Sequence, residues 1–185
     1  MHIGKTLYVT TARQWRAWLN RNHAKAKEIW LVYYKKASGK SRIPYNDAVD
    51  QALCFGWIDS IVKSIDEHSY AQRWTPRRKG SLLSELNKER IMRMIKTKQM
   101  TPAGMHAVRH AFDGKAKNNE IPKDILRALK KDSEAWKHFI KFPESYKRIR
   151  IGWIDAAHGR PALYKQRLEY FIKMTRKNKR FGMVQ

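Results

Sequence analysis

Apolar residues recur with a helical period near the start of the chain and with a strand period soon after it. Residues 12–23 predict a short amphipathic helix, opened by a capping-box motif that begins at Thr11. The next apolar run, residues 29–34, carries aromatic and β-branched residues on both faces, which is typical of a strand buried on both sides. Pro44 is placed to open a second helix, which Gly56 would end.

Two further strands are predicted after this glycine. Residues 57–66 and 70–75 have strand-like sequences, and the polar residues 67–69 are suited to the turn between them. Because a short turn joins antiparallel neighbours, the two strands should lie side by side. Together with residues 29–34 they would form a small, three-stranded antiparallel sheet.

The rest of the chain has a helical pattern, which proline and glycine residues interrupt. The predicted helices cover residues 85–98, 102–112, 122–131, 133–141, 143–157 and 162–177. The fold class is therefore α+β, with N-terminal helices and a small antiparallel sheet followed by an all-helical C-terminal region. The predicted divisions are an α+β module over 1–113, a linker over 114–120, a helical module over 121–178 and a frayed tail over 179–185.

The charge of the chain extends this picture to its surface. Forty Lys and Arg residues against 16 Asp and Glu give a net charge of +24. The charge is evenly divided, because residues 1–105 and residues 106–185 each contain 20 basic and 8 acidic residues, a net +12. The basic character therefore belongs to the whole surface and not to a tail. It predicts an anionic partner such as nucleic acid, anionic lipid headgroups or an acidic protein; the alternative is a surface that serves only solubility.

Catalytic and metal-binding motifs are not evident. The sequence has no Gly-x-Ser-x-Gly elbow, no dinucleotide-binding glycine motif and no phosphate-binding loop. His106 and His110 have the spacing of a zinc-binding helix but lack its glutamate and a third ligand, so we expect neither a metal nor a cofactor. His158, three residues after Asp155, suits a helix end through the helix dipole. The apolar neighbours of the single cysteine, Cys54, favour a small buried hydrophobe over a nucleophile.

The start of the chain bears on its location. The first ten residues lack the apolar segment of a secretory signal, and no run of about 18 apolar residues occurs anywhere. We therefore expect a cytoplasmic protein without a transmembrane segment. The sequence does not define an oligomeric state.

The densest group of chemically versatile residues lies between Phe55 and Arg78. Aromatic faces beside guanidinium groups suit stacking on bases and pairing with phosphates or carboxylates. In the alternative interpretation, Trp57 and Trp74 belong to the core, and Asp59 is a structural partner of Arg73. The candidate ligand-binding residues are Trp57, Asp59, Lys63, Arg73, Trp74, Arg77 and Arg78.

The chain resembles the YdeI/OmpD-associated family, also called bacteriocin-protection proteins. Its most specific matching segment is Cys54-Phe-Gly-Trp-Ile-Asp-Ser60. The segment 157–167 departs from the family pattern, which puts any function of that segment in doubt. The resemblance implies a link to survival of antimicrobial peptides and bacteriocins and to an outer-membrane porin, but it supplies no catalytic residues. The other matching segments are residues 18–23, 30–36, 43–48, 52–53, 73–78, 87, 100–104, 121–124 and 128–129.

Three functions are compatible with these observations. The first is a non-catalytic stress-response or bacteriocin-protection protein that binds an anionic partner. The second is a nucleic-acid-binding protein that uses the same basic surface. The third is an enzyme for a small polar substrate, with Asp59 in its pocket. The sequence favours the first and leans against catalysis.

Overall fold

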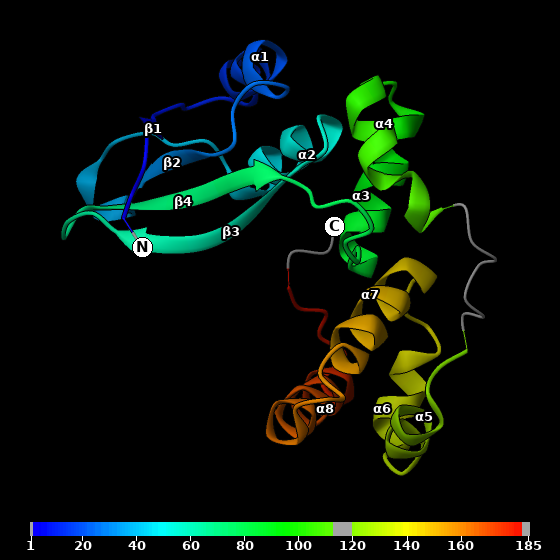
Figure 1. Cartoon of the computed structure of the whole chain (residues 1–185). Helices are drawn as coiled ribbons and strands as arrows, with labels where there is room; N and C mark the ends of the chain where they lie inside the picture. Colours follow the sequence, from blue (N-terminus) through cyan, green and yellow to red (C-terminus); the bar gives the residue numbers. More distant parts are fainter. Residues whose placement is uncertain (1, 113–119, 183–185) are drawn as a thin grey trace. The chain divides into compact units, whose positions relative to one another are not determined.

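The computed structural model describes residues 2–112 and 120–182 (Figure 1). The described residues form two compact units. Residues 2–82 and 90–112 form the first, which we call the sheet unit, and residues 83–89 and 120–182 form the second, which we call the helical unit. Helix α3 (Glu85–Lys96) contributes its beginning to the helical unit and its end to the sheet unit. The fold class is α+β, as predicted.

The sheet of the first unit is mixed and not antiparallel. Its strands lie in the order β1-β2-β4-β3, with β1 parallel to β2 and the other pairs antiparallel. The three predicted strands are antiparallel to one another, as expected, but the prediction missed β1, because this strand has only two residues and shows no alternation that a sequence could reveal. The strands are β1 (Thr6–Leu7), β2 (Ile29–Tyr34), β3 (Trp57–Ser64) and β4 (Ser69–Pro76).

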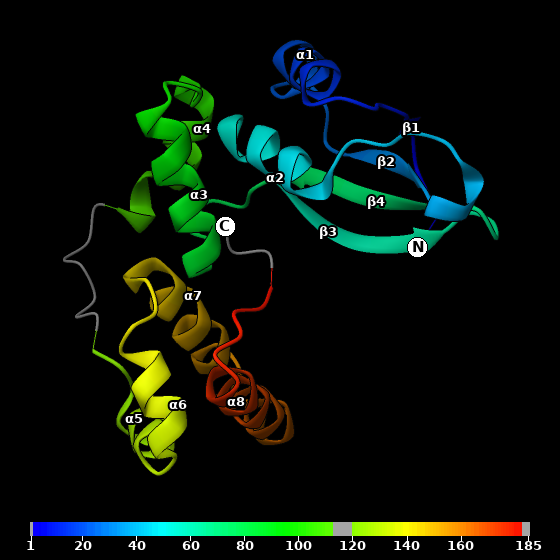
Figure 2. The same cartoon turned by 180° about the vertical axis from the view of Figure 1, so that it is seen from behind.

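Two helices, α1 (Ala12–Asn22) and α2 (Tyr45–Cys54), lie on the same side of this sheet (Figures 1 and 2). The predicted capping box is present at the start of α1. Tryptophan rings join α1 to the sheet: Trp15 lies 5.7 Å from Trp74 between ring centroids, and Trp18 lies 5.7 Å from Trp57. Burial of these large rings removes a large apolar area from water in this core. A short 3-10 helix, η1 (Lys36–Ser38), follows β2.

The end of α2 is held by a close backbone approach. Helix α4 (Pro102–Val108) begins at Thr101, whose hydroxyl donates to the carbonyl oxygen of Cys54 at 2.7 Å. A Cβ atom on Gly104 would lie 2.1 Å from the same oxygen, so only glycine permits this packing. The predicted helix over 102–112 ends earlier than expected and continues as the 3-10 helix η2 (Arg109–Ala111).

The helical unit contains the four predicted C-terminal helices. A shared core of isoleucine, leucine and aromatic side chains packs between them, including Ile125, Leu129 and Phe171, all fully buried. The helices are α5 (Lys123–Lys130), α6 (Ser133–Phe139), α7 (Glu144–Asp155) and α8 (Pro161–Arg176). No helix in residues 2–112 or 120–182 is both long and apolar enough to span a membrane.

The predicted divisions of the chain stay predictions. The linker over 114–120 lies outside the described residues except for Glu120. In the tail over 179–185, of which 179–182 are described, Phe181 contacts the rings of Tyr170 and Phe171. Its ring-centroid distances are 4.8 Å and 6.4 Å, so this part of the tail packs on the helical unit.

Candidate functional site

The two tryptophans of the predicted site lie in the core of the sheet unit. Trp57 is 1% exposed and Trp74 is fully buried. The indole nitrogen of Trp57 donates to the carbonyl oxygen of His23 at 3.2 Å, and that of Trp74 has no hydrogen-bond partner among the described residues. With their rings packed on α1, neither offers a face for stacking on a base. This burial favours the structural interpretation of the two residues.

Asp59 is held on the same face of the sheet by polar neighbours. Its Oδ2 atom accepts hydrogen bonds from the Tyr45 hydroxyl at 2.8 Å and from Gln72 Nε2 at 2.7 Å. Burial, followed by the charge of Asp59, raises the pKa of Tyr45, so this phenol stays a proton donor. The nearby Tyr33 hydroxyl is buried, and within residues 2–112 and 120–182 it has no hydrogen-bond partner. The two hydrogen bonds orient the Asp59 carboxylate.

Arg73 lies on the opposite face from Asp59, because successive residues of a strand point to opposite faces. Its partner is Glu28, whose Oε2 atom lies 2.7 Å from Arg73 Nε and 2.6 Å from Nη2. Hydrogen bonding from Arg73 is the main cause of the lowered pKa of Glu28. The predicted partnership of Asp59 with Arg73 is therefore wrong, although their strands are adjacent as expected.

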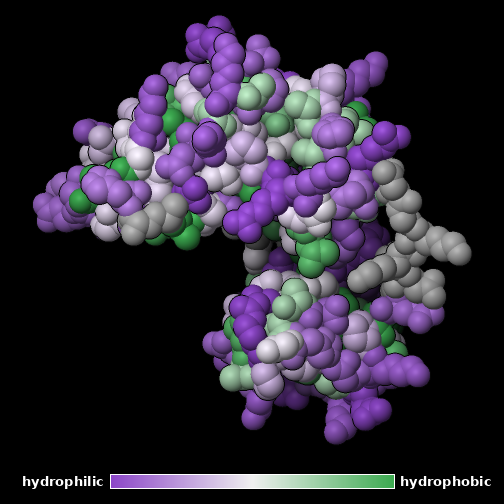
Figure 3. Space-filling model, in the orientation of Figure 1, coloured by the Kyte–Doolittle hydropathy of each residue, from purple (hydrophilic) through white to green (hydrophobic). Residues whose placement is uncertain are grey.

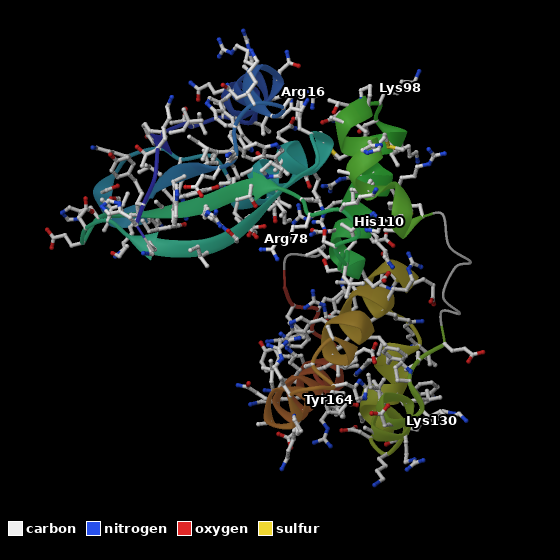
Figure 4. The ribbon with its side chains drawn as sticks, in the orientation of Figure 1. Arg16, Arg78, Lys98, His110, Lys130 and Tyr164 are labelled. Atoms are coloured by element: carbon white, nitrogen blue, oxygen red, sulfur yellow. The ribbon has the colours of Figure 1, made fainter. Side chains whose placement is uncertain are left out.

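The remaining predicted residues are dispersed. Arg77 Nη2 donates to the Ser81 hydroxyl at 3.1 Å and to the Leu82 carbonyl at 2.9 Å, and burial lowers the pKa of its guanidinium. Lys63 is half-buried on β3, at the edge of the sheet. Arg78 is exposed in the loop after β4 (Figure 4). The structure therefore does not bring the seven predicted residues into one site, and their ligand role stays a prediction.

The sequence interpretation missed a basic face on α5. Four cationic side chains lie on one face of this helix, at spacings of four, seven and eight residues from the first, and surround Leu126. They line an open depression of about 400 Å³. Among the described residues, no ion pair joins any of the four to a carboxylate. We call Lys123, Arg127, Lys130 and Lys131 the α5 basic face.

The opposite side of α5 explains why these cations point outward. Ile125 and Leu129 are fully buried in the core of the helical unit, which leaves the basic positions at the surface. Lys130 places its ammonium 5.3 Å from the centroid of the Trp136 ring, a contact that partly orients it. Figure 3 shows hydrophilic side chains over most of the visible face of each unit.

A second depression, of about 580 Å³, lies in the sheet unit. The α1 residues Arg13, Arg16 and Asn20 line it together with Gln51 of α2. Arg16 is already engaged, since it donates to Gln51 Oε1 and to the carbonyl oxygen of Gln99, each at 2.9 Å (Figure 4). Asp59 is not among the residues that line this depression.

Comparison with known protein families also divides the chain into an N-terminal and a C-terminal part, as the two structural units do. Residues 7–107, more than half of the chain, match the model of a domain of unknown function (DUF8412). Residues 118–178 match the model of the family described as bacteriocin-protection, YdeI or OmpD-associated. The chain belongs to the DUF8412 family, and its residues 118–178 carry the match to the bacteriocin-protection, YdeI or OmpD-associated model. Searches of curated proteins and of solved structures returned no match.

The match over residues 118–178 confirms the predicted family. The resemblance was expected over most of the chain, however, and the match covers only this C-terminal part. Most of the segments that suggested it, including Cys54–Ser60, lie within the DUF8412 match. The bacteriocin-protection match instead covers α5 to α8, together with the divergent segment 157–167. The α5 basic face therefore belongs to the bacteriocin-protection domain.

The divergent segment of this domain makes a contact that anchors α5. His158 lies between two carboxylates, with Nε2 3.0 Å from Asp124 Oδ2 and Nδ1 2.9 Å from Asp155 Oδ1. The Tyr164 hydroxyl donates to the same Asp124 oxygen (Figure 4 labels Tyr164). Asp124 is the main cause of the raised pKa of His158, and the Tyr164 hydrogen bond is the main cause of the lowered pKa of Asp124. Asp155 lies three residues before His158 at the end of α7, and Asp124 lies in the first turn of α5.

Proposed function

We propose that this chain is a non-catalytic protection protein that binds an anionic partner through the α5 basic face of its bacteriocin-protection domain. The observation that carries the proposal is the convergence of four cations on one open depression, without a carboxylate paired to any of them among the described residues. Exposed cations that have no ion-pair partner can stay hydrated while they gain Coulomb energy from an anionic surface.

The charge of the surrounding domain supports the same proposal. Residues 120–182 contain 17 Lys and Arg against 7 Asp and Glu, a net charge of +10. A domain with this charge repels a cationic peptide, so protection by direct capture of such a peptide is disfavoured. Protection through binding to an anionic partner is instead consistent with the positive charge of this domain.

The lining of the two depressions supports a non-catalytic role. The first is lined by cationic side chains and one leucine, the second by cationic, amide and alanine side chains, and neither lining contains a carboxylate, a histidine or a hydroxyl. Lysine can also act as a base or a nucleophile when burial lowers its pKa, but the lysines that line the first depression are exposed. Binding is the activity that these side chains can supply.

The proposal is tested by binding of the full chain to three defined anionic probes. These are a 20-base-pair DNA duplex, vesicles containing phosphatidylserine, and poly-glutamate, each measured at low salt. The variant replaces Lys123, Arg127, Lys130 and Lys131 by glutamine. Its matched control replaces four exposed lysines of the sheet unit by glutamine, namely Lys25, Lys27, Lys35 and Lys36.

Only the α5 variant should lose affinity for the probe that the natural chain binds best, and that probe identifies the class of partner. An equal loss in the two variants would mean that the whole surface acts without a site, which would contradict the proposal. The same pair should differ in bacteria exposed to a bacteriocin: the control should protect like the natural chain, and the α5 variant should not.

A further inference from the structure

Arg150 is a buried cation in the helical unit, away from the α5 basic face. This residue of α7 is 6% exposed, and its Nε atom is enclosed without a hydrogen-bond partner. Among the described residues, no hydrogen bond or ion pair involves its side chain. Its guanidinium carbon instead lies 4.9 Å, 5.6 Å and 5.8 Å from the ring centroids of Phe181, Trp153 and Tyr146.

The aromatic rings compensate only part of the cost of burying this charge. A guanidinium removed from water loses hydration that contacts with ring faces return incompletely. Buried charges in proteins are therefore normally paired with an opposite charge. Burial also lowers the pKa of Arg150, which is the expected response of a cation without a counter-ion.

Two other arginines lie near the aromatic side chains that enclose Arg150. Arg167 of α8 places its guanidinium 4.6 Å from the ring centroid of Trp153, so this indole lies close to two arginines. Arg180 lies close enough to help lower the pKa of Tyr146, the phenol beside Arg150. Neither Arg167 nor Arg180 takes part in an ion pair among the described residues.

We propose that Arg150, with Arg167 and Arg180 beside it, forms a binding site for a phosphate group. Three guanidinium groups match the two negative charges of a phosphate better than the single charge of a carboxylate. Arg167 Nη1 already donates to the carbonyl oxygen of Trp153, which leaves its other nitrogens for the phosphate. The inference goes beyond the proposed function, because the site uses none of the residues of the α5 basic face.

Gly182 borders the same guanidinium. A Cβ atom at this position would lie 2.7 Å from Arg150 Nη1 and 2.9 Å from Nη2. The residue also has a φ of +80°, which favours glycine. Gly182 therefore lies against the two Nη nitrogens of Arg150, and a side chain here would displace the guanidinium.

The test is thermal unfolding of the full chain in phosphate and in chloride at equal ionic strength. Phosphate should raise the melting temperature of the natural chain in a saturable manner, because a ligand that binds only the folded state stabilises it. Arg150→Met removes the charge at similar volume; it should abolish this rise without lowering the melting temperature in chloride. Lys173→Met, which removes one exposed charge from α8, should keep the full rise.

A second variant and two further ligands complete the test. Arg167→Gln with Arg180→Gln keeps Arg150 and should weaken phosphate binding, measured by calorimetry, roughly tenfold or more. Glycerol phosphate and adenosine monophosphate distinguish a site for the phosphate alone from one that also contacts a base. No phosphate-dependent rise in the natural chain, or an undiminished rise in Arg150→Met, would overturn the proposal.

Discussion

The ion pair between α2 and α3 offers the sharpest stability prediction in the sheet unit. Asp50 is 9% exposed and accepts hydrogen bonds from Arg90 Nη1 at 2.7 Å and from Arg93 Nη2 at 2.5 Å. Arg90 is 6% exposed and also donates to the side chain and carbonyl oxygen of Asn46. Asp50→Asn removes the charge and leaves Arg90 buried without a counter-ion.

The expected cost follows from that uncompensated charge. Breaking a buried ion pair by removing one partner costs about 3–5 kcal/mol. Arg93 adds little to this figure, because its side chain is 42% exposed and its interaction is screened by solvent. For a unit of this size, such a loss should lower the melting temperature by at least roughly 12 °C.

The assay is urea and thermal unfolding of the full chain, followed by circular dichroism. Asp47→Asn is the matched control, because Asp47 lies one helical turn away on α2 and is exposed. Its substitution should cost less than about 1 kcal/mol, mainly through the helix dipole. Equal effects of the two substitutions would refute the reasoning, as would a loss below about 1 kcal/mol for Asp50→Asn.

Three further predictions concern other parts of the chain. Trp74→Ala should cost about 3–5 kcal/mol in urea unfolding, whereas Arg78→Ala should change stability by less than about 0.5 kcal/mol; similar losses would contradict the burial described for the tryptophan. Gly104→Ala should destabilise the sheet unit far more than Gly80→Ser, since only the former creates a clash with backbone; a small loss would show that α4 can shift. The raised pKa of His158 means that its stabilising contribution is full below its ordinary value near 6.5 and is lost as pH rises through the raised value. In His158→Gln, the fall of the melting temperature above about pH 6.5 should therefore be smaller, and an unchanged profile would count against this role.

The helices and most strands of this chain could be predicted from its sequence, because their apolar residues have clear periods. Ile125 and Leu129 define the buried stripe of α5, and the β-branched run at 29–34 defines the central strand β2. Strand β1 could not be predicted, since two residues paired through their backbone leave no side-chain pattern. The end of α4 at Val108 also left no signal that distinguishes it from a longer helix.

The candidate site was harder to predict, because it depends on which face of each element is buried. Asp59 and Arg73 lie on neighbouring strands, yet the alternation of β4 places them on opposite faces. The α5 basic face has a signal in the sequence, in the helical spacing of its cations, but its exposure follows only from the packing of the helical unit. Arg150 lies between two isoleucines, and only the observed packing shows that its guanidinium is enclosed by rings.

The most direct test of anion binding by the α5 basic face is the salt dependence of binding to a 20-base-pair DNA duplex. Each phosphate that a cation neutralises adds about 0.9 to the slope of log K against log salt concentration. Replacing Lys123, Arg127, Lys130 and Lys131 by glutamine should make the slope shallower by about 3–4, while the four-lysine control variant should change it by less than about 1. An unchanged slope in the α5 variant, or an equal change in the control, would contradict binding at this face.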